Sequence, residues 1–321
     1  MAHSELLEIV RRPLSPDTHL EVPATRSEYE RVQGILEGED AKFPTLQYDG
    51  FRKVVIVSAA PSPMHGDMVG QVLSAISDEV KLMPGLDANI KRRLISSSDR
   101  RHTRDTGDTA TTRNWDGALV YRTGEGKTLM VAVEVGVSQT YESLRAAISF
   151  SVCALRCRVG IAMCINEGDR GTAPAIRYYA TRVEKRTAIG EIEHDLDSQL
   201  QTHPFGPLKI EEDTWFGEVT SVVLETYRLE DDNSPPETLL NPTQSFTIVE
   251  NGRFVGEEVP PNLAEITLGD CIPTHVLSGS NIEVTPVNFF HQDWFEDTFR
   301  LSMLETAMER VEDKTPSRDV E

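Results

Sequence analysis

Two neighbouring segments of this chain have the pattern of β-strands, and each carries one acidic residue. The segments are Asp116–Arg122 and Leu129–Val137, and the glycine-containing turn Thr123–Lys127 between them is typical of a hairpin. Valines occupy every second position from 131 to 137, which predicts that one face of the second strand packs in a core. Glu134 then points from the opposite face, between two small residues. A charge in so apolar a strand is costly unless it is paired or bound to a metal.

Asp116 stands at the start of the first strand, which brings it close to Glu134 in an antiparallel hairpin. Both carboxylates would reach one cation there. Oxygen ligands that leave positions open for water favour Mg²⁺ or Mn²⁺. The pair therefore predicts a divalent-metal site. The structural alternative is a hydrogen-bonded pair of acids that binds no metal.

Helix and strand patterns alternate around this hairpin, which predicts an α/β fold with a mixed sheet flanked by helices. The capping pattern Thr25-Arg26-Ser27-Glu28 opens a predicted helix that runs to about residue 36. Further predicted helices are 65–82, 141–156 and the amphipathic 293–311. Predicted strands are 54–57, 92–96, 159–165, 176–183, 219–227 and a hairpin at 246–255 around Asn251-Gly252. Three prolines predict an irregular arm over residues 1–24. The polar stretch 99–113 has no periodicity and predicts a loop.

These patterns divide the chain into four parts. Residues 1–50 form an N-terminal arm with a short helix, and residues 51–185 form the α/β core. Residues 186–312 form a β-rich C-terminal elaboration that ends in the amphipathic helix. Residues 313–321 are predicted to be a disordered tail.

The chain carries a formal net charge of −20, from 52 acidic and 32 basic residues. This charge repels nucleic acid at long range, so nucleic-acid binding would need a local basic patch or a bound cation. The four cysteines include no C-x-x-C pair, which argues against a zinc site and a disulfide framework. No apolar run approaches the roughly 18 residues of a membrane span. The start of the chain lacks a signal-peptide pattern, so we expect no membrane association and an intracellular protein of the cytoplasm or nucleus.

Three short motifs follow one another along the predicted core. They are Pro61-Ser62-Pro63-Met64-His65, Trp115-Asp116 and Glu134-Val135-Gly136-Val137-Ser138-Gln139. With the strands beneath them they resemble the PD-(D/E)XK nuclease superfamily of restriction-endonuclease-like folds. They are similar above all to a divergent, mostly fungal group with P-S-x-x-H, P-D and E-V-x-x-S-Q motifs. The resemblance covers about residues 50–185 and implies a restriction-endonuclease-like core that hydrolyses phosphodiesters of DNA or RNA.

Carried over by position, the resemblance implies that Asp116 and Glu134 are the metal ligands. A tryptophan replaces the usual proline before the first acid. Gly136 occupies the position of a lysine that normally orients the attacking water and stabilises developing charge. Gln139, through its amide, or Arg145, from the next helix, would have to replace that lysine.

His65 opens the predicted helix 65–82, beside which such folds often place an auxiliary acid or base. A histidine side chain titrates near neutral pH and is suited to proton transfer. The alternative is that His65 only caps the helix or hydrogen-bonds to the preceding proline-rich turn.

Residues 91–104 hold the main concentration of basic side chains in this acidic chain. Its members are Lys91, Arg92, Arg93, Arg100, Arg101, His102 and Arg104. Because they flank the segment before Asp116, they predict contacts with the phosphates of a nucleic acid. A solvated loop is the alternative.

The leading function is therefore a divalent-metal-dependent nuclease, and the superfamily resemblance is compatible with a homodimer. The alternative is a catalytically inactive nuclease-fold protein whose acidic surface binds a protein partner.

Overall fold

The structure is a computed structural model that describes most of the chain. The described residues are 5–39, 43–104, 111–124, 126–137, 139–168, 182–229, 231, 234–255, 262–263, 265–277 and 281–314, with only the backbone described for 98–104, 182–186 and 281. In this part of the chain, no helix is both long enough and apolar enough to cross a membrane.

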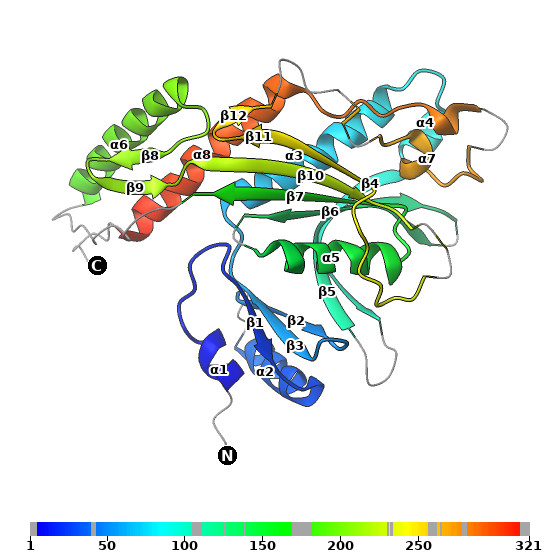
Figure 1. The fold of residues 1–321 in the computed structure, drawn as a ribbon, viewed down its shortest axis with the longest axis horizontal. Coiled ribbons are helices and arrows are strands. Elements are labelled where there is room, and N and C mark those ends of the chain that lie inside the picture. The colour runs from blue at the N-terminus through cyan, green and yellow to red at the C-terminus, as the bar shows by residue number, and fades with distance from the viewer. Residues whose placement is uncertain are drawn as a thin grey trace.

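A large, mostly antiparallel sheet organises the molecule (Figure 1). Its strands are β1 (His19–Pro23), β2 (Thr45–Asp49), β3 (Val54–Ser58), β4 (Leu94–Arg104), β5 (Thr111–Arg122), β6 (Lys127–Gly136), β7 (Val159–Glu167), β10 (Val219–Tyr227), β11 (Gln244–Glu250) and β12 (Arg253–Phe254). The strand order is β1-β3-β2-β5-β6-β7-β10-β11-β12, and β4 also pairs with β5. Among the described strands, only the β6–β7 pair is parallel. The predicted α/β class with a mixed sheet and flanking helices is confirmed at this level.

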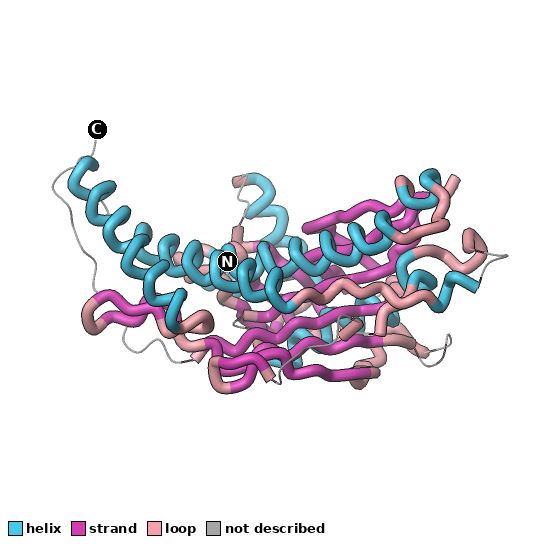
Figure 2. Tube along the Cα trace, turned by 90° about the horizontal axis from the view of Figure 1, so that it is seen from above, coloured by secondary structure: helices cyan, strands magenta, loops and turns pink. Residues whose placement is uncertain are grey.

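Helices cover both faces of the central strands. The long helices are α3 (Pro63–Leu82), α5 (Tyr141–Cys153), α6 (Arg182–Thr202) and α8 (Gln292–Lys314). Helices α3, α6 and α8 form a layer over one face (Figure 2), where they share a core with the alternate valines of β6. Helix α5 connects the parallel strands and packs on the other face, against Ala132 and Ala162. The valine core and the second, small-residue face of β6 are thus arranged as predicted.

The N-terminal elements gather at one end of the sheet (Figure 1). Helices α1 (Glu5–Val10) and α2 (Arg26–Gly38) pack on β1, β2 and β3 around a separate apolar cluster. Thr25 caps α2 by accepting a hydrogen bond from the backbone N–H of Glu28, as the capping pattern predicts. The irregular arm predicted for residues 1–24 is wrong, since residues 5–23 include α1 and β1.

The C-terminal part contains more helix than expected. Residues 182–202 form α6, in which Leu196 and Leu200, four residues apart, are buried. The region 186–312, predicted to be β-rich, therefore begins with a helix that was not predicted. The predicted strand 176–183 lies mostly outside the described residues, and its last two residues begin α6.

The rest of the C-terminal part combines short elements with the predicted hairpin. The short elements are β8 (Leu208–Ile210), β9 (Asp213–Phe216), α7 (Leu268–Cys271), a 3₁₀ turn (Asn281–Val284) and, earlier in the chain, α4 (Ala88–Lys91). The β11–β12 hairpin turns at Asn251 and Gly252, both with positive φ, as predicted. The terminal helix is also confirmed, and it runs to Lys314, so the first two residues of the predicted disordered tail 313–321 are helical. The rest of that tail lies outside the described residues.

The loop predicted for residues 99–113 is wrong. Strand β4 continues to Arg104 and β5 begins at Thr111, so most of this polar stretch lies in an antiparallel ladder; residues 105–110 lie outside the described part. Along its other edge, β5 pairs with β6 from Gly117 onward and with β2 at Thr112. Asp116 therefore lies on β5 between the residue that pairs with β2 and those that pair with β6.

Gly117 is required by the close packing of α3 on β5. A Cβ atom at this position would lie 2.5 Å from Val69 Cγ1 and 2.6 Å from Leu73 Cδ1. We expect Gly117→Ala to lower the free energy of unfolding by about 1–3 kcal/mol, because the added methyl overpacks this contact. Gly34→Ala, in α2, is the control, since its Cβ meets no heavy atom within 4 Å. Urea unfolding of both variants tests this, and a Gly117→Ala protein as stable as wild type would contradict it.

Candidate active site

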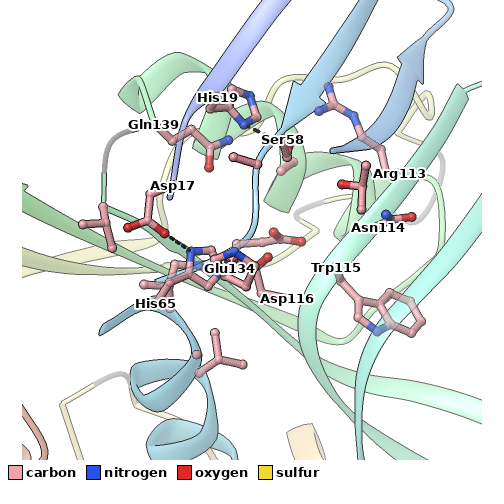
Figure 3. A pocket seen from close by; sticks show the side chains of 18 of the residues that line it. Asp17, His19, Ser58, His65, Arg113, Asn114, Trp115, Asp116, Glu134 and Gln139 are labelled. Atoms are coloured by element: carbon pink, nitrogen blue, oxygen red, sulfur yellow. Dashed lines mark hydrogen bonds and ion pairs between the residues drawn. The ribbon is translucent and has the colours of Figure 1, made fainter. Parts of the chain in front are cut away.

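A cavity of about 590 Å³ opens between the N-terminal strands, α3 and the β5–β6 hairpin. Asp116, Glu134 and His65 line it together, although 69 positions separate the first and last of these in the chain (134 − 65). Figure 3 shows Glu134 and Asp116 side by side, with the His65 imidazole against them. The structure therefore brings the predicted acids and the predicted histidine into one site.

The strand register places the two acids beside each other. Gly117 pairs with Val133, so the next positions along the ladder are Asp116 and Glu134. The backbone N–H of Val135 donates to Asp116 Oδ2 at 2.8 Å, which fixes the Asp116 carboxylate at the end of the hairpin. Glu134 is only 5% exposed, whereas the Asp116 side chain keeps 25% of its surface exposed.

The two carboxyl groups differ in protonation. Burial, and then the neighbouring Asp116 charge, raise the pKa of Glu134 well above its usual value. Burial also raises the pKa of Asp116, but the charge and hydrogen bond of His65 reverse this shift and leave that pKa below its usual value. The two carboxyl groups of the pair are thus shifted in opposite directions, with Glu134 the one that holds a proton to higher pH.

His65 lies between two carboxylates. Its Nε2 is 3.1 Å from Asp116 Oδ2, and its Nδ1 is 3.9 Å from Asp17 Oδ1. Burial lowers the pKa of His65, but Asp116 and then Asp17 more than offset this and raise it. Ser62 rather than His65 caps α3, because the Ser62 hydroxyl accepts from the His65 backbone N–H. The His65 imidazole therefore lines the cavity, and the alternative in which this side chain caps the helix is wrong.

Asp17 is a site residue that the sequence did not indicate. It has a left-handed backbone with φ of 60°, and its Oδ1 accepts from the Ser62 backbone N–H at 2.8 Å. Its Oδ2 is buried without a hydrogen-bond partner in the described structure. Only its position after a proline, in a stretch with no periodicity, distinguishes it in the sequence.

Arg113 is a buried basic residue in the cavity wall, and the sequence did not indicate it as a site residue. Among the described residues that line the cavity, it is the only arginine or lysine. Its Nη2 donates to Asp49 Oδ2 at 2.9 Å, and both side chains are buried. Burial lowers the pKa of Arg113, while the charges of Asp49 and Glu134 oppose that shift. Arg113 and Glu134 line the same cavity.

A polar network forms the wall above the acids. His19 Nε2 lies 2.7 Å from Ser143 Oγ, and the Gln139 amide donates to the same hydroxyl at 3.2 Å. Burial, and then the Arg113 charge, lower the pKa of His19 to about 4, so its imidazole is neutral at neutral pH. Gln139 lines the cavity as the prediction requires, but its amide nitrogen is engaged by Ser143.

Arg145 does not reach the site. Its Nε donates to the Leu240 carbonyl and its Nη2 to Asn241 Oδ1, both at 2.6 Å, and it does not line the cavity. Helix α5 turns this side chain toward the C-terminal segment. The prediction that Arg145 replaces the missing lysine beside the two acids is therefore wrong.

Gly136, at the position where the resemblance would place a lysine, is packed against α5. A Cβ atom there would lie 3.2 Å from Leu144 Cδ2 and 3.5 Å from Gln139 Cβ. The space beside this position is thus occupied by the side chains of Leu144 and Gln139.

The basic residues of the 91–104 segment do not line the cavity where they are described. Arg92 and Arg93 are exposed beside α4, near the end of the ladder where Leu94 pairs with Tyr121. Arg100, Arg101 and Arg104 lie in β4, opposite Trp115, Asn114 and Thr111, and their side chains lie outside the described part. Their contact with nucleic acid stays a prediction.

Comparison of the chain with protein-family models, with curated proteins and with solved structures found no match in any of the three. The function must therefore be inferred from the geometry of this cavity.

Proposed function

We propose that this protein is a divalent-metal-dependent phosphodiesterase of nucleic acids, with a restriction-endonuclease-like core. The observation that carries the proposal is the pair of adjacent acids, Asp116 and buried Glu134, in the lining of one cavity. A cation entering the pair would displace the proton of Glu134 and remove the cost of the buried acids. The motif resemblance and the position of the pair in the β5–β6 hairpin support the same function.

The donor set fits Mg²⁺ or Mn²⁺. In the described part of the chain, no group of three or more His, Cys, Asp and Glu side chains is arranged to hold a metal ion. Magnesium is often bound by only one or two carboxylates, with water and substrate phosphates as the other ligands. Asp116 and Glu134 would hold the cation in this way. When bound, it would lower the pKa of water and neutralise charge on the phosphate.

The remaining side chains would divide the other roles. His65, with Nε2 at Asp116, would carry a proton to or from the reacting oxygens. Arg113 would stabilise negative charge on the phosphate in place of a lysine at position 136. Gln139 would orient the substrate from the wall of the cavity.

One observation favours the alternative, a silent module that binds a protein partner. Leu144 and Gln139 pack at the position where the superfamily lysine would stand, so the site departs from the active pattern. The net charge of −20 would suit a basic protein partner.

Cleavage of labelled single-stranded and duplex oligonucleotides of DNA and RNA, with Mg²⁺ or Mn²⁺, separates the two functions. We expect metal-dependent cleavage that falls at least about a hundredfold in Asp116→Asn, since a direct ligand should cost no less than an outer-shell partner. Asp78→Asn, which removes an exposed carboxylate paired only with Lys81, is the matched control. If the wild-type protein cleaves none of these substrates, the proposed phosphodiesterase activity is rejected. If Asp116→Asn cleaves as fast as wild type, the proposed active site at Asp116 and Glu134 is rejected.

A further inference from the structure

The two acids of the cavity are recessed from the surface, since Glu134 is 5% exposed and the Asp116 side chain 25%. The β5–β6 hairpin carries the acids on one side, and the N-terminal strands contribute Thr45 and Ser58 on the other. Figure 3 shows side chains of both parts facing the same space. The exposed glycines of α3, Gly66 and Gly70, border its mouth. A substrate therefore reaches the acids within this space, between the two walls.

The size of the cavity suits one nucleotide unit. Its volume of about 590 Å³ lies within the range of roughly 300–1,000 Å³ typical of sites for small ligands. A double helix is far larger, since its major groove alone is about 12 Å wide. A site of this volume matches a chain end or an unpaired nucleotide, and a continuous duplex is too large to enter it.

The lining has the chemistry of a site for a base and a sugar. Uncharged donors and acceptors form much of it, including Thr45, Gln47, Ser58, Ser97, Asn114 and Gln139. Phe43 adds an aromatic ring to the same wall. Base edges and sugar hydroxyls are read by such groups, and bases stack on aromatic rings.

Arg113 provides a subsite for the phosphate. Its side chain is 5% exposed, and Asp49 holds one of its terminal nitrogens. Its Nε is buried without a hydrogen-bond partner in the described structure. A guanidinium binds phosphate well through paired N–H groups, and an incompletely paired buried cation favours an anion nearby.

We propose that the cavity binds a single nucleotide unit of an unpaired strand or chain end, with its phosphate between Arg113 and the Asp116–Glu134 pair. This inference rests on the proposed function and names its substrate class, single-stranded or terminal nucleic acid in place of an internal duplex site.

Gly70 gives a test that leaves the acids and Arg113 intact. A Cβ atom there meets no heavy atom within 4 Å, and the residue is exposed on α3 at the cavity mouth. Gly70→Leu would place a bulky side chain in the mouth and favour the helix, because leucine is the better helix former. Gly190→Leu is the matched control, since Gly190 is also an exposed helical glycine with open space and lies in α6, outside the cavity lining.

Fluorescence anisotropy in Ca²⁺ should compare 5′-phosphorylated single-stranded octanucleotides of DNA and RNA with a duplex whose ends are closed by hairpins. We expect wild type to bind the better single strand at least tenfold more tightly than the closed duplex. Gly70→Leu should bind that single strand at least tenfold more weakly than wild type does, while its Tm stays at or above the wild-type value. Gly190→Leu should bind the single strand with wild-type affinity. Equal affinity for the closed duplex, or unchanged binding by folded Gly70→Leu, would overturn the inference.

Cleavage in Mg²⁺ or Mn²⁺ is scored separately, so that the two proposals can fail independently. Tight, Gly70-sensitive binding without cleavage would reject the hydrolase and leave the nucleotide site in place. Cleavage of the closed duplex that depends on Asp116 but is unchanged in Gly70→Leu would keep the hydrolase and overturn the nucleotide site.

Discussion

Replacing Asp49 with alanine is expected to lower the free energy of unfolding by about 3–5 kcal/mol, because the change leaves Arg113 as an unpaired buried charge. Both side chains of this pair are at most 8% exposed. Asp49 Oδ1 also accepts from the backbone N–H groups of Phe51 and Arg52, at 3.1 and 3.0 Å, so the change removes the acceptor of that turn as well. Chemical denaturation at pH 7 measures the loss.

Two further variants separate the buried charge from other causes. Glu21→Ala breaks the ion pair with Arg52, whose side chain is 44% exposed, and should cost less than about 1 kcal/mol. The double variant Asp49→Leu with Arg113→Met replaces the buried pair by apolar groups and should recover most of the stability. A double variant as unstable as Asp49→Ala alone would contradict an electrostatic origin.

Replacing Glu134 with glutamine is expected to abolish metal binding, with a loss above the ~10–100-fold typical of an outer-shell partner. The same change should alter the pH dependence of the metal-free protein. Because folding raises the pKa of Glu134, the folded state keeps its proton longer, and stability should fall as pH rises above about 4.5, the ordinary value, toward the raised one. Glu134→Gln should lack this fall.

Thermal unfolding across pH 4 to 9, without metal, checks the second part of this prediction. Glu142→Gln serves as the control, since Glu142 is an exposed glutamate in the first turn of α5. A wild-type pH profile that is the same as that of Glu134→Gln would show that Glu134 titrates normally in the folded protein.

The local signals of the sequence were sufficient for the central elements. Alternating valines identified β6, and helical spacing identified α3 with its end at Leu82. The same alternation placed Glu134 on the face away from the valine core. From these elements the proximity of Asp116 and Glu134 follows directly, because a hairpin register is a local property.

The walls of the cavity depend on long-range pairing, which local patterns do not reveal. Strand β1 pairs with β3 and begins at His19, within a proline-containing stretch that has no periodicity. The first half of β5 carries buried polar residues, Thr111, Thr112 and Arg113, so it lacks the alternation of an ordinary strand. Arg113 and its partner Asp49 are 64 positions apart. Their contact follows from the pairing of β5 with β2.

The most direct test of the metal site is calorimetric titration of Mn²⁺ into wild type and folded Glu134→Gln at pH 7, in two buffers with different ionisation enthalpies. We expect one site of millimolar or tighter affinity in wild type, with an observed enthalpy that depends on the buffer because a proton leaves Glu134. Glu134→Gln should show no binding. Absence of binding to wild type, or equal binding by Glu134→Gln, would contradict a metal centre at Asp116 and Glu134.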